Sequence, residues 1–493
     1  MHSQDYTDLG RFDINNVNIP VNGLIKHLIE TSDTCVDTDL NTMHRIYELR
    51  FRETTRPIDI RSSYIRIKGQ VGGTDAGVFK GIDKFYPEVA TADEMTILTP
   101  GWLYNAFEEV AMLIDNQNIE TVREPRATMM MKAHLQHDWE GITGDTYTSS
   151  CLYDRDIKSV YTKKVRAGTY DKNNRTHLIN ADGTFEFMIP LALLFETVRT
   201  LPAHYMNVYP VIQIKRAITT ASGISATYIT PSNIVNEKEI GKIVTPLLTP
   251  EIVFKKLELV YNEIVFNDGI DTKVVENQYN KPNVSIHHRK WDSQTINYES
   301  GRLNTKLTLT PSRHGNSAMV IAWYEDTSPQ DKAKLNSGYY HEPFRVINAE
   351  ATYAGVKVCN LQRIDDGNIT TTTLLDEIDN NVVPKAAEGQ PVNTTTFNGN
   401  LKRVYEQFKE NLSVTYSDKT LGMDYETFRL RRPYIFVDMS KYNLAGGDEI
   451  ARVLNVSITH TMSKKYKMIV WLLSNEVTIL NPRNGDLLVT GGL

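Results

Sequence analysis

Apolar and polar residues alternate along many short stretches of this sequence, and this period of two constrains the fold more than any other feature. The clearest stretches are Ile65 and Ile67 in SYIRIKGQ, Leu257, Leu259 and Tyr261 in KKLELVYN, Leu307 and Leu309 in TKLTLTP, and Leu454, Val456 and Ile458 in VLNVSITH. Alternation of this kind predicts β-strands with one buried face. Turn-forming clusters such as GQVGGTDAG at 69–77 and NDGID at 267–271 lie between such stretches.

The most apolar segment, residues 184–217, is interrupted by Pro190, Pro202, Pro210, Glu196 and Arg199, so it forms neither one helix nor one membrane span. Its apolar side chains alternate in two places: Phe185, Phe187 and Ile189 in the first, and Val208, Ile212 and Ile214 in the second. The piece between them, 191–195, is too short for an independent helix. We expect two core strands of a β-sandwich, joined by a short helical turn and facing one core.

Helical spacing is rare in this sequence. It occurs in NLKRVYEQFKENLS, with Asn400 as the expected N-cap and with apolar residues at Leu401, Val404, Tyr405, Phe408 and Leu412. Residues 127–136, ATMMMKAHLQ, form a second candidate helix. Its methionines suit either a plastic binding surface or an irregular core, and we favour the core.

Many strands, few helices and abundant turns predict an all-β protein with two sandwiches, because 493 residues exceed the size of one ordinary sandwich. The Thr-Pro pairs and charges at 231–251 favour a division near there. We expect an N-terminal arm at 1–50, in which residues 23–31 form either part of the arm or a small helix, a first sandwich at 51–240 and a second at 241–493. A long polar insertion lies near 364–400, where a surface loop is expected.

Composition limits the function classes. Hydrophobic residues make up 41% and charged residues 23%, and neither a membrane span nor a secretory signal is visible, so we expect a soluble, unsecreted chain without a transmembrane segment. The formal net charge of -6, with dispersed basic residues, argues against direct bulk nucleic-acid binding. Three scattered cysteines, Cys35, Cys151 and Cys359, argue against a disulfide framework.

No established catalytic or cofactor motif is present, so we expect no enzyme, no cofactor and no catalytic or metal site. His341 and Glu342 start like a zinc-protease helix, but Pro343 follows. His287 and His288 are adjacent and would point to opposite faces of a strand. The remaining candidates are His134 and His137 beside Asp138, the pair Glu108 and Glu109, and the pair Asp365 and Asp366, for all of which we favour surface positions.

The order of several segments resembles double jelly-roll major capsid proteins of the virophage, polinton (Maverick), adintovirus and polinton-like virus type. The segment 102–119 resembles a short helical stretch that leads into a strand of that family, and the helix at 128–136 follows it. The segment 184–217 resembles the closing strands of the first jelly roll. The segment 254–265 resembles the first strand of the second jelly roll, and 452–480 resembles its closing pair.

The resemblance implies a fold of two consecutive eight-stranded jelly rolls, at 51–240 and 241–493, and a structural function in a virion. Three chains would form a homotrimeric capsomer with a pseudo-hexagonal outline, which tiles an icosahedral shell of a DNA virus assembled inside the host cell. Its expected partners are neighbouring capsomers, penton proteins and minor capsid proteins. The loops at 139–180 and 364–400 are expected to form towers or contacts between subunits, and the arm at 1–50 is expected to touch neighbours.

One alternative function remains from the residues themselves. The sequence contains 25 tyrosines, which suit a sugar-binding groove as well as a subunit interface. With the polar loop at 364–400, they keep open a carbohydrate-binding or carbohydrate-cleaving β-sandwich. A vertex capsid protein is less favoured, because it would contain one jelly roll instead of two.

Overall fold

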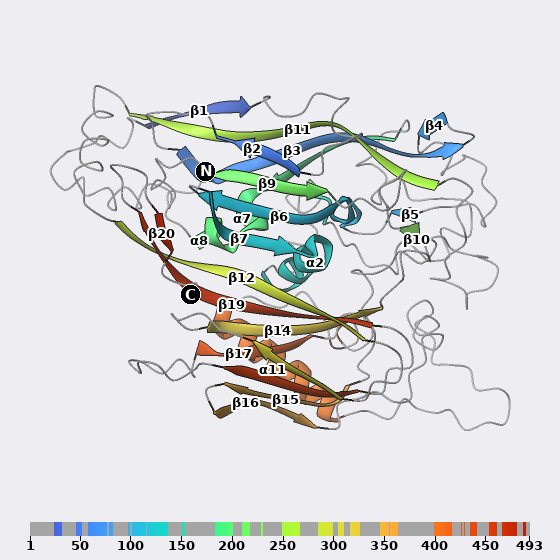
Figure 1. Cartoon of the computed structure of the whole chain (residues 1–493), viewed down its shortest axis with the longest axis vertical. Helices are drawn as coiled ribbons and strands as arrows, with labels where there is room; N and C mark the ends of the chain where they lie inside the picture. The colour runs from blue at the N-terminus through green and yellow to red at the C-terminus, as the bar shows by residue number, and fades with distance from the viewer. Residues whose placement is uncertain are drawn as a thin grey trace.

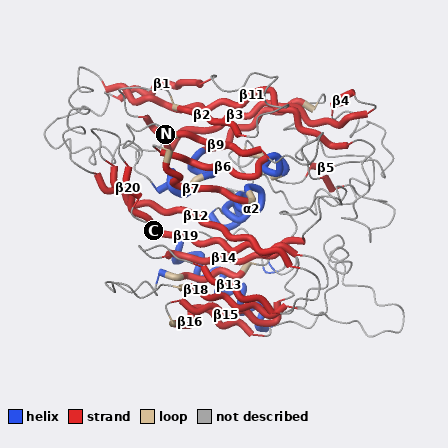
Figure 2. The backbone as a smooth tube through the Cα atoms, viewed as in Figure 1, coloured by secondary structure: helices blue, strands red, loops and turns tan. Residues whose placement is uncertain are grey.

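The computed structural model consists mainly of antiparallel strands, with few helices (Figure 2). It describes the following residues: 24–31, 46–51, 58–75, 78–81, 97–98, 101–114, 116–136, 150–152, 183–200, 210–216, 228–229, 249–266, 284–298, 304–309, 316–325, 346–353, 355–362, 399–416, 425, 428, 434–440, 453–460, 466–480 and 487–489.

The described strands form two units, each with two facing sheets, apart from the short pair of Ile97–Leu98 with Tyr228–Ile229. The first unit contains β1 (Leu24–Thr31), β2 (Ile46–Arg50), β3 (Ile58–Asp75), β4 (Val78–Gly81), β5 (Ile97–Leu98), the short helix η5 (Trp102–Ala106), β6 (Phe107–Ile114), β7 (Gln117–Arg123), α2 (Pro125–Gln136), β8 (Thr184–Pro190), α7 (Leu191–Leu194), α8 (Glu196–Thr200), β9 (Val211–Arg216), β10 (Tyr228–Ile229) and β11 (Thr249–Phe266). The second unit contains β12 (Val284–Tyr298), β13 (Asn304–Leu309), β14 (Asn316–Glu325), β15 (Val346–Tyr353), β16 (Val356–Gln362), α11 (Gly399–Tyr416), β17 (Ile435–Asp438), β18 (Leu454–His460), β19 (Tyr466–Leu480) and β20 (Leu487–Val489).

The two units repeat one strand order. In the first, one sheet has the order β1-β11-β3, with β8 and β4 on the free side of β3, and the facing sheet has the order β2-β9-β6-β7. In the second, the corresponding orders are β12-β19-β14-β17 and β13-β18-β15-β16. In the first unit the first strand, β1, pairs with the last, β11, and in the second unit β12 pairs in the same way with β19, which is followed only by the short strand β20. The strands of the two orders are distributed between the facing sheets in the same sequence along the chain. This is the strand order of a jelly roll, present twice.

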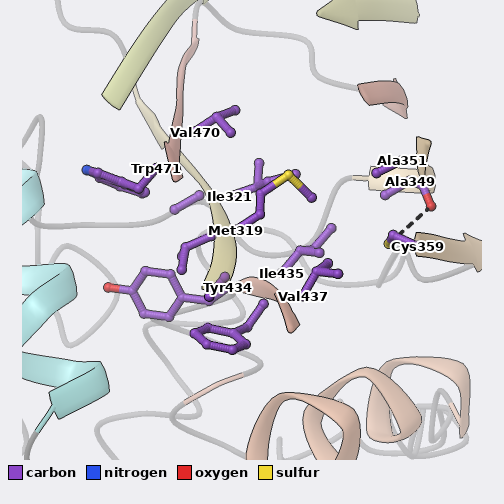
Figure 3. Close-up of a cluster of buried hydrophobic side chains, with 14 of the residues drawn as sticks. Met319, Ile321, Ala349, Ala351, Cys359, Tyr434, Ile435, Val437, Val470 and Trp471 are labelled. Atoms are coloured by element: carbon purple, nitrogen blue, oxygen red, sulfur yellow. Dashed lines mark hydrogen bonds between the residues drawn. The ribbon is translucent and has the colours of Figure 1, made fainter. Parts of the chain in front are cut away.

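Each unit encloses its own core. In the first, Ile65, Ile67 and Leu257 of one sheet and Leu49 and Ile212 of the other belong to one cluster of buried side chains. In the second, Met319, Ile321 and Val470 face Ala349 and Ala351 across the sandwich (Figure 3). The sheets and helices are stacked along the longest axis of the molecule, with β1 near one end and β16 near the other (Figure 1).

The apolar segment at 184–217 folds largely as predicted. β8 lies in one sheet of the first unit, β9 lies in the facing sheet, and α7 and α8 follow β8. Phe185, Phe187 and Ile189 of β8 and Ile212 and Ile214 of β9 are all buried in the first core. Pro210 directly precedes β9, as expected for a strand start, while Pro202 and Val208 lie outside the described residues.

Both predicted helices are confirmed. α11 buries all five of its expected apolar residues: Leu401, Val404, Tyr405, Phe408 and Leu412. It begins at Gly399, so Asn400 lies inside the helix and is not its N-cap. α2 buries Met129, Met130 and Met131, which confirms that the methionines fill a core.

Two expectations about strand membership are wrong. Residues 23–31, expected as an arm or a small helix, instead contain strand β1, which pairs with β11 from Leu24↔Phe266 to Thr31↔Leu259. The segment 254–265 does not open the second jelly roll, because β11 pairs with β3 and so closes the first one. Alternation shows that a segment is a strand but not which strand it pairs with, and this explains the second error.

The loops at 139–180 and 364–400 lie almost wholly outside the described residues.

Candidate functional site

The two units meet at a junction, which is the part of the described structure with the most buried polar groups. On the side of the first unit it consists of β7, α2 and α8, and on the side of the second unit it consists mainly of β12 and β19 (Figure 1). Its geometry decides how firmly one unit is held against the other.

Helix α2 supplies the apolar part of the junction because both of its sides are buried. Its residues divide between the two cores: Met129, Met130 and Ala133 in the first, and Ala127, Met131 and Leu135 in the second. A helix that is apolar on opposite sides must pack between two bodies. Separating the units would therefore expose apolar surface of α2 to water.

Glu120 of β7 lies at the polar centre of the junction and is only 1% exposed. Its Oε1 atom accepts from the backbone N–H of Glu196 at 3.1 Å and of Trp291 at 3.4 Å, and its Oε2 atom accepts from the N–H of Thr197 at 2.8 Å. The first turn of a helix leaves N–H groups without intrahelical partners, so this carboxylate satisfies two of those of α8. Since Trp291 lies on β12, the same carboxylate binds both units.

Lys132 of α2 supplies the opposite charge. Its Nζ atom lies 3.5 Å from Oε1 of Glu120 and donates a hydrogen bond to the carbonyl of Leu194, and the side chains of both members of the pair are at most 1% exposed. A buried charge is costly to remove from water unless an opposite charge and hydrogen bonds compensate it. Glu120 and Lys132 thus compensate each other and connect α2, α7, α8, β7 and β12.

His288 of β12 forms a second polar contact across the junction. Its Nε2 atom lies 2.8 Å from Oγ1 of Thr478, and its Nδ1 atom lies 3.4 Å from Oγ1 of Thr197. The Thr197 hydroxyl donates its one proton to the carbonyl of Arg289 at 3.1 Å. Toward His288 this hydroxyl can therefore only accept, so the Nδ1–H group of His288 is the donor. Burial, helped by the nearby charges of Lys290 and His287, lowers the pKa of His288 to about 4. The imidazole is therefore neutral at pH 7.

α2 is also hydrogen-bonded to the second unit. The indole Nε1 of Trp471 on β19 donates to Oγ1 of Thr128 at 3.0 Å, and the Thr128 hydroxyl donates to the carbonyl of Arg123 at 2.6 Å. His134 Nδ1 lies 2.9 Å from the hydroxyl oxygen of Tyr434. These contacts fix the rotation of α2 against β19 as well as its distance from it.

Two adjoining polar grooves open at the edge of the junction. The first has a volume of about 370 Å³ and lies between β7 and β12, where Asn118, Glu120, Lys290 and Asp292 line it. The second has a volume of about 400 Å³ and includes Glu108, Glu109 and Glu124. The described residues that line them include no tyrosine. The carbohydrate hypothesis, which was based on tyrosines, thus obtains no specific support from these grooves.

The histidine candidates divide into one confirmed and one wrong prediction. His287 is exposed and His288 is 4% exposed, which confirms that they point to opposite faces of a strand. His134, expected at the surface, is buried at 5% exposure. The reason is that α2 lies between the two units, so that it has no solvated side at this position. His137, Asp138, His341 and Glu342 lie outside the described residues.

The carboxylate candidates form separate surface ion pairs. Glu108 lies 2.7 Å from Lys215, and Glu109 lies 3.6 Å from Arg123. Their side chains are 42% and 30% exposed, which agrees with the surface positions expected for them. Asp365 and Asp366 lie outside the described residues.

Within the described ranges, no group of three or more His, Cys, Asp or Glu side chains has the arrangement of a metal site. The two described cysteines, Cys151 and Cys359, are both buried. None of the helices among the described residues combines the length and apolar character needed to cross a bilayer.

Comparison with known proteins finds similarity in structure alone. No family model and no curated protein matches the sequence. PBCV-1 VP54, as fitted into a reconstruction of the virophage Sputnik, aligns with a TM-score of 0.51 at 8% identity, over 97% of this chain and 99% of that one. A chain of the Sputnik virophage structure aligns at 0.46 and 9% identity over 96% and 90%, and the mavirus major capsid protein at 0.41 and 9% identity over 97% and 92%.

At 8% identity, the likeness to VP54 concerns the fold, and it agrees with the strand order that the two units repeat. The expected fold class is confirmed: the chain has the double jelly-roll fold of capsid proteins such as PBCV-1 VP54.

Proposed function

We propose that this chain is the major capsid protein of an icosahedral DNA virus. Three copies would form a homotrimeric capsomer with a pseudo-hexagonal outline. The observation that supports this proposal most directly is the repeat of one strand order in two rigidly joined units of a single chain. Three such chains around a threefold axis present six similar bodies, which is the shape needed to tile a facet with hexagons.

The junction supports this function because a shell subunit must keep its shape. Glu120, Lys132 and α2 join the two units through buried charges and apolar contacts. A linker with few contacts would allow the units to rotate against each other. The chemistry of the junction is therefore best understood as structural.

We further propose a revised division of the chain. The expected ranges were an arm at 1–50, a first jelly roll at 51–240 and a second at 241–493. The strand pairing of β1 and β11 favours a first jelly roll that extends from about residue 24 to 266 and a second that follows it. The insertions at 139–180 and 364–400 remain our candidates for towers or contacts between subunits. Neighbouring capsomers, penton proteins and minor capsid proteins remain the proposed partners in the virion.

The proposal is tested by the mass and outline of the purified protein. Light scattering should give three times the mass of the chain, and negative-stain images should show particles with threefold symmetry. A monomer that persists over a wide range of protein concentration would contradict the proposal. Binding to a glycan array, together with a monomeric mass, would favour the carbohydrate alternative.

A further inference from the structure

An oxygen atom of a buried carboxylate lacks a hydrogen-bond partner beside the junction. It is Oε2 of Glu476 on β19, a residue that is 2% exposed, and no described residue donates to it. The other oxygen, Oε1, lies 3.6 Å from Nζ of Lys290, which is longer than an ordinary hydrogen bond. A buried carboxylate is costly unless charges and donors compensate it. Oε2 is therefore an acceptor that this arrangement of side chains leaves unused.

His288 is the residue directly opposite Glu476. In the antiparallel pair of β12 and β19 the two are Cα partners. Side chains of directly opposed residues leave the same face of a sheet, with Cβ atoms about 4.5–5.5 Å apart, so rotation about their side-chain bonds can bring them into contact. His288 is 4% exposed and Glu476 is 2% exposed. Water therefore screens little of a charge that appears on one of them from the other.

Neutral His288 uses both of its ring nitrogens in other contacts. Its Nδ1–H group donates to Oγ1 of Thr197 on α8 at 3.4 Å, and its Nε2 atom accepts from the hydroxyl of Thr478 at 2.8 Å. A further proton can bind only at Nε2, because Nδ1 already carries one. Nε2 then becomes a donor, and the hydroxyl of Thr478 can no longer donate to it. Protonation therefore creates a buried cation that needs an acceptor.

Glu476 is the acceptor best placed for this cation. The titratable and charged groups on the described elements packed around β12 are as follows: His287, Arg289, Lys290 and Asp292 of β12, Glu476 of β19, Glu196 and Arg199 of α8, Glu120 of β7 and Lys132 of α2. Glu120 and Glu196 are ion-paired within the first unit. The side chain of Asp292 is 53% exposed, so water solvates it. Among these carboxylates only Glu476 has a buried oxygen without a partner, and an ionised acceptor holds a cation more strongly than the hydroxyl of Thr478 does.

We propose that the junction has an acid form, in which the imidazolium of His288 binds Oε2 of Glu476 and releases Thr197 of α8. A proton from water binds Nε2, and the ring turns from the first unit toward β19 of its own unit. A contact between the units is thereby replaced by a contact within the second unit. α8 then remains attached through the hydroxyl of Thr197 at the carbonyl of Arg289 and through Glu120. The result is a looser junction between two sandwiches that stay folded.

The pH range of this response follows from the surroundings of His288. Burial, together with the positive charges of Lys290 and His287, lowers its pKa to about 4, so the neutral form holds the junction closed at pH 7. A carboxylate that binds the protonated ring raises the pKa from this value. The acid form therefore accumulates as the pH falls from the ordinary histidine value of 6.5 toward 4. This response goes beyond the proposed function, because it occurs in one chain and requires no assembly.

The protonation of His288 gives the first measurement. The exchange rate of its ring C2 proton, followed by mass spectrometry of the full chain over a range of pH, reports its pKa separately from those of the other histidines. Glu476→Gln removes the carboxylate at nearly the same volume, and we expect the proton affinity of His288 to fall about tenfold. The matched control, Glu108→Gln, removes a carboxylate of a surface ion pair and should leave the proton affinity of His288 unchanged.

Amide hydrogen exchange shows whether the junction loosens. The unmodified chain and His288→Gln are compared at the same pH, so that the effect of pH on chemical exchange cancels. At about pH 4 we expect α8 to exchange about fivefold faster in the unmodified chain, which is the effect of one lost hydrogen bond. At pH 7 the two proteins should exchange alike in α8. β14, inside the second core, should remain protected in both proteins at both pH values.

Two results together support the acid form: a lower proton affinity of His288 in Glu476→Gln, and faster exchange of α8 at acid pH in the unmodified chain. An unchanged proton affinity would show that Glu476 serves only its ion pair with Lys290, and it overturns the proposal. Equal exchange of α8 in the two proteins at acid pH, or loss of protection in β14 as well, also overturns it. His288→Gln decides alone if Glu476→Gln does not fold. None of these outcomes depends on the number of copies, so the proposed function is tested separately.

Discussion

At the scale of single residues, the two units are joined by charged groups that water does not reach. Glu120 accepts N–H groups from both units, and Lys132 compensates its charge. Lys132 is visible in the sequence as the one charged residue inside MMMKAHL, but nothing there indicates that Glu120 is its partner. The pair depends on β7 and α2 lying side by side, which only the tertiary fold decides. His288 differs in part, because strand alternation predicts that it and His287 point to opposite faces.

The first prediction concerns this ion pair. Lys132→Met removes the charge at similar volume and leaves the Glu120 carboxylate buried beside N–H groups alone. We expect the free energy of unfolding to fall by about 3–5 kcal/mol. Lys215→Met is the control, because its partner Glu108 is 42% exposed, and it should cost at most about 1 kcal/mol. Urea denaturation measures both, and similar small losses for the two variants would show that the buried pair has no special role.

The second prediction concerns the pH dependence of stability. The pKa of His288 is about 4 in the folded chain, against an ordinary value of 6.5. Between these values the unfolded chain binds more protons than the folded one, so stability falls as the pH decreases through this window. We expect the unmodified chain to lose about 2 kcal/mol more than His288→Gln between pH 7 and pH 5. Chemical denaturation at both pH values gives the comparison, and equal losses would mean that His288 titrates normally in the folded state.

At the scale of elements, the sequence predicts which segments are strands more readily than it predicts which strands pair with each other. Alternation indicates β3, β8, β11, β13 and β18 correctly. It fails for β1, because Leu24, Ile25, Leu28 and Ile29 also fit helical spacing, and only pairing with β11 makes the segment a strand. The Gly-rich stretch at 69–77, expected as a turn, continues β3 to Asp75, and the chain reverses only at the end of the stretch, where Asp75 pairs with Val78 of β4. Glycines permit a turn without requiring one.

The third prediction concerns α2, which belongs to both cores. Met129 and Met131 are both 0% exposed, but the first packs in the core of the first unit and the second in that of the second. Met129→Ala and Met131→Ala should each lower stability by about 2–5 kcal/mol. Because α2 couples the units, each variant should speed global hydrogen exchange in β6 and in β14 alike. Faster exchange confined to the unit that contains the altered core would show that the units unfold separately.

At the scale of the whole molecule, the fold follows from a repeat that the sequence does not reveal. The two units share strand order and even one register shift in the hairpins β6–β7 and β15–β16. Their side chains nevertheless differ, since Glu120 lies next to the shift in the first hairpin and Cys359 lies next to it in the second. A jelly roll requires alternation and turns at given places, and many different apolar residues satisfy this requirement. Similar folds at 8% identity are therefore expected.

The central claim is that two equivalent jelly rolls, rigidly joined in one chain, build a capsomer from three copies. Cryo-electron microscopy of the purified full-length protein tests it most directly. The account predicts particles with a threefold axis and a hexagonal outline, in which six similar sandwiches surround the axis and each chain contributes two adjacent ones. Single chains whose two units take variable relative orientations, or rings with another number of copies, would contradict it.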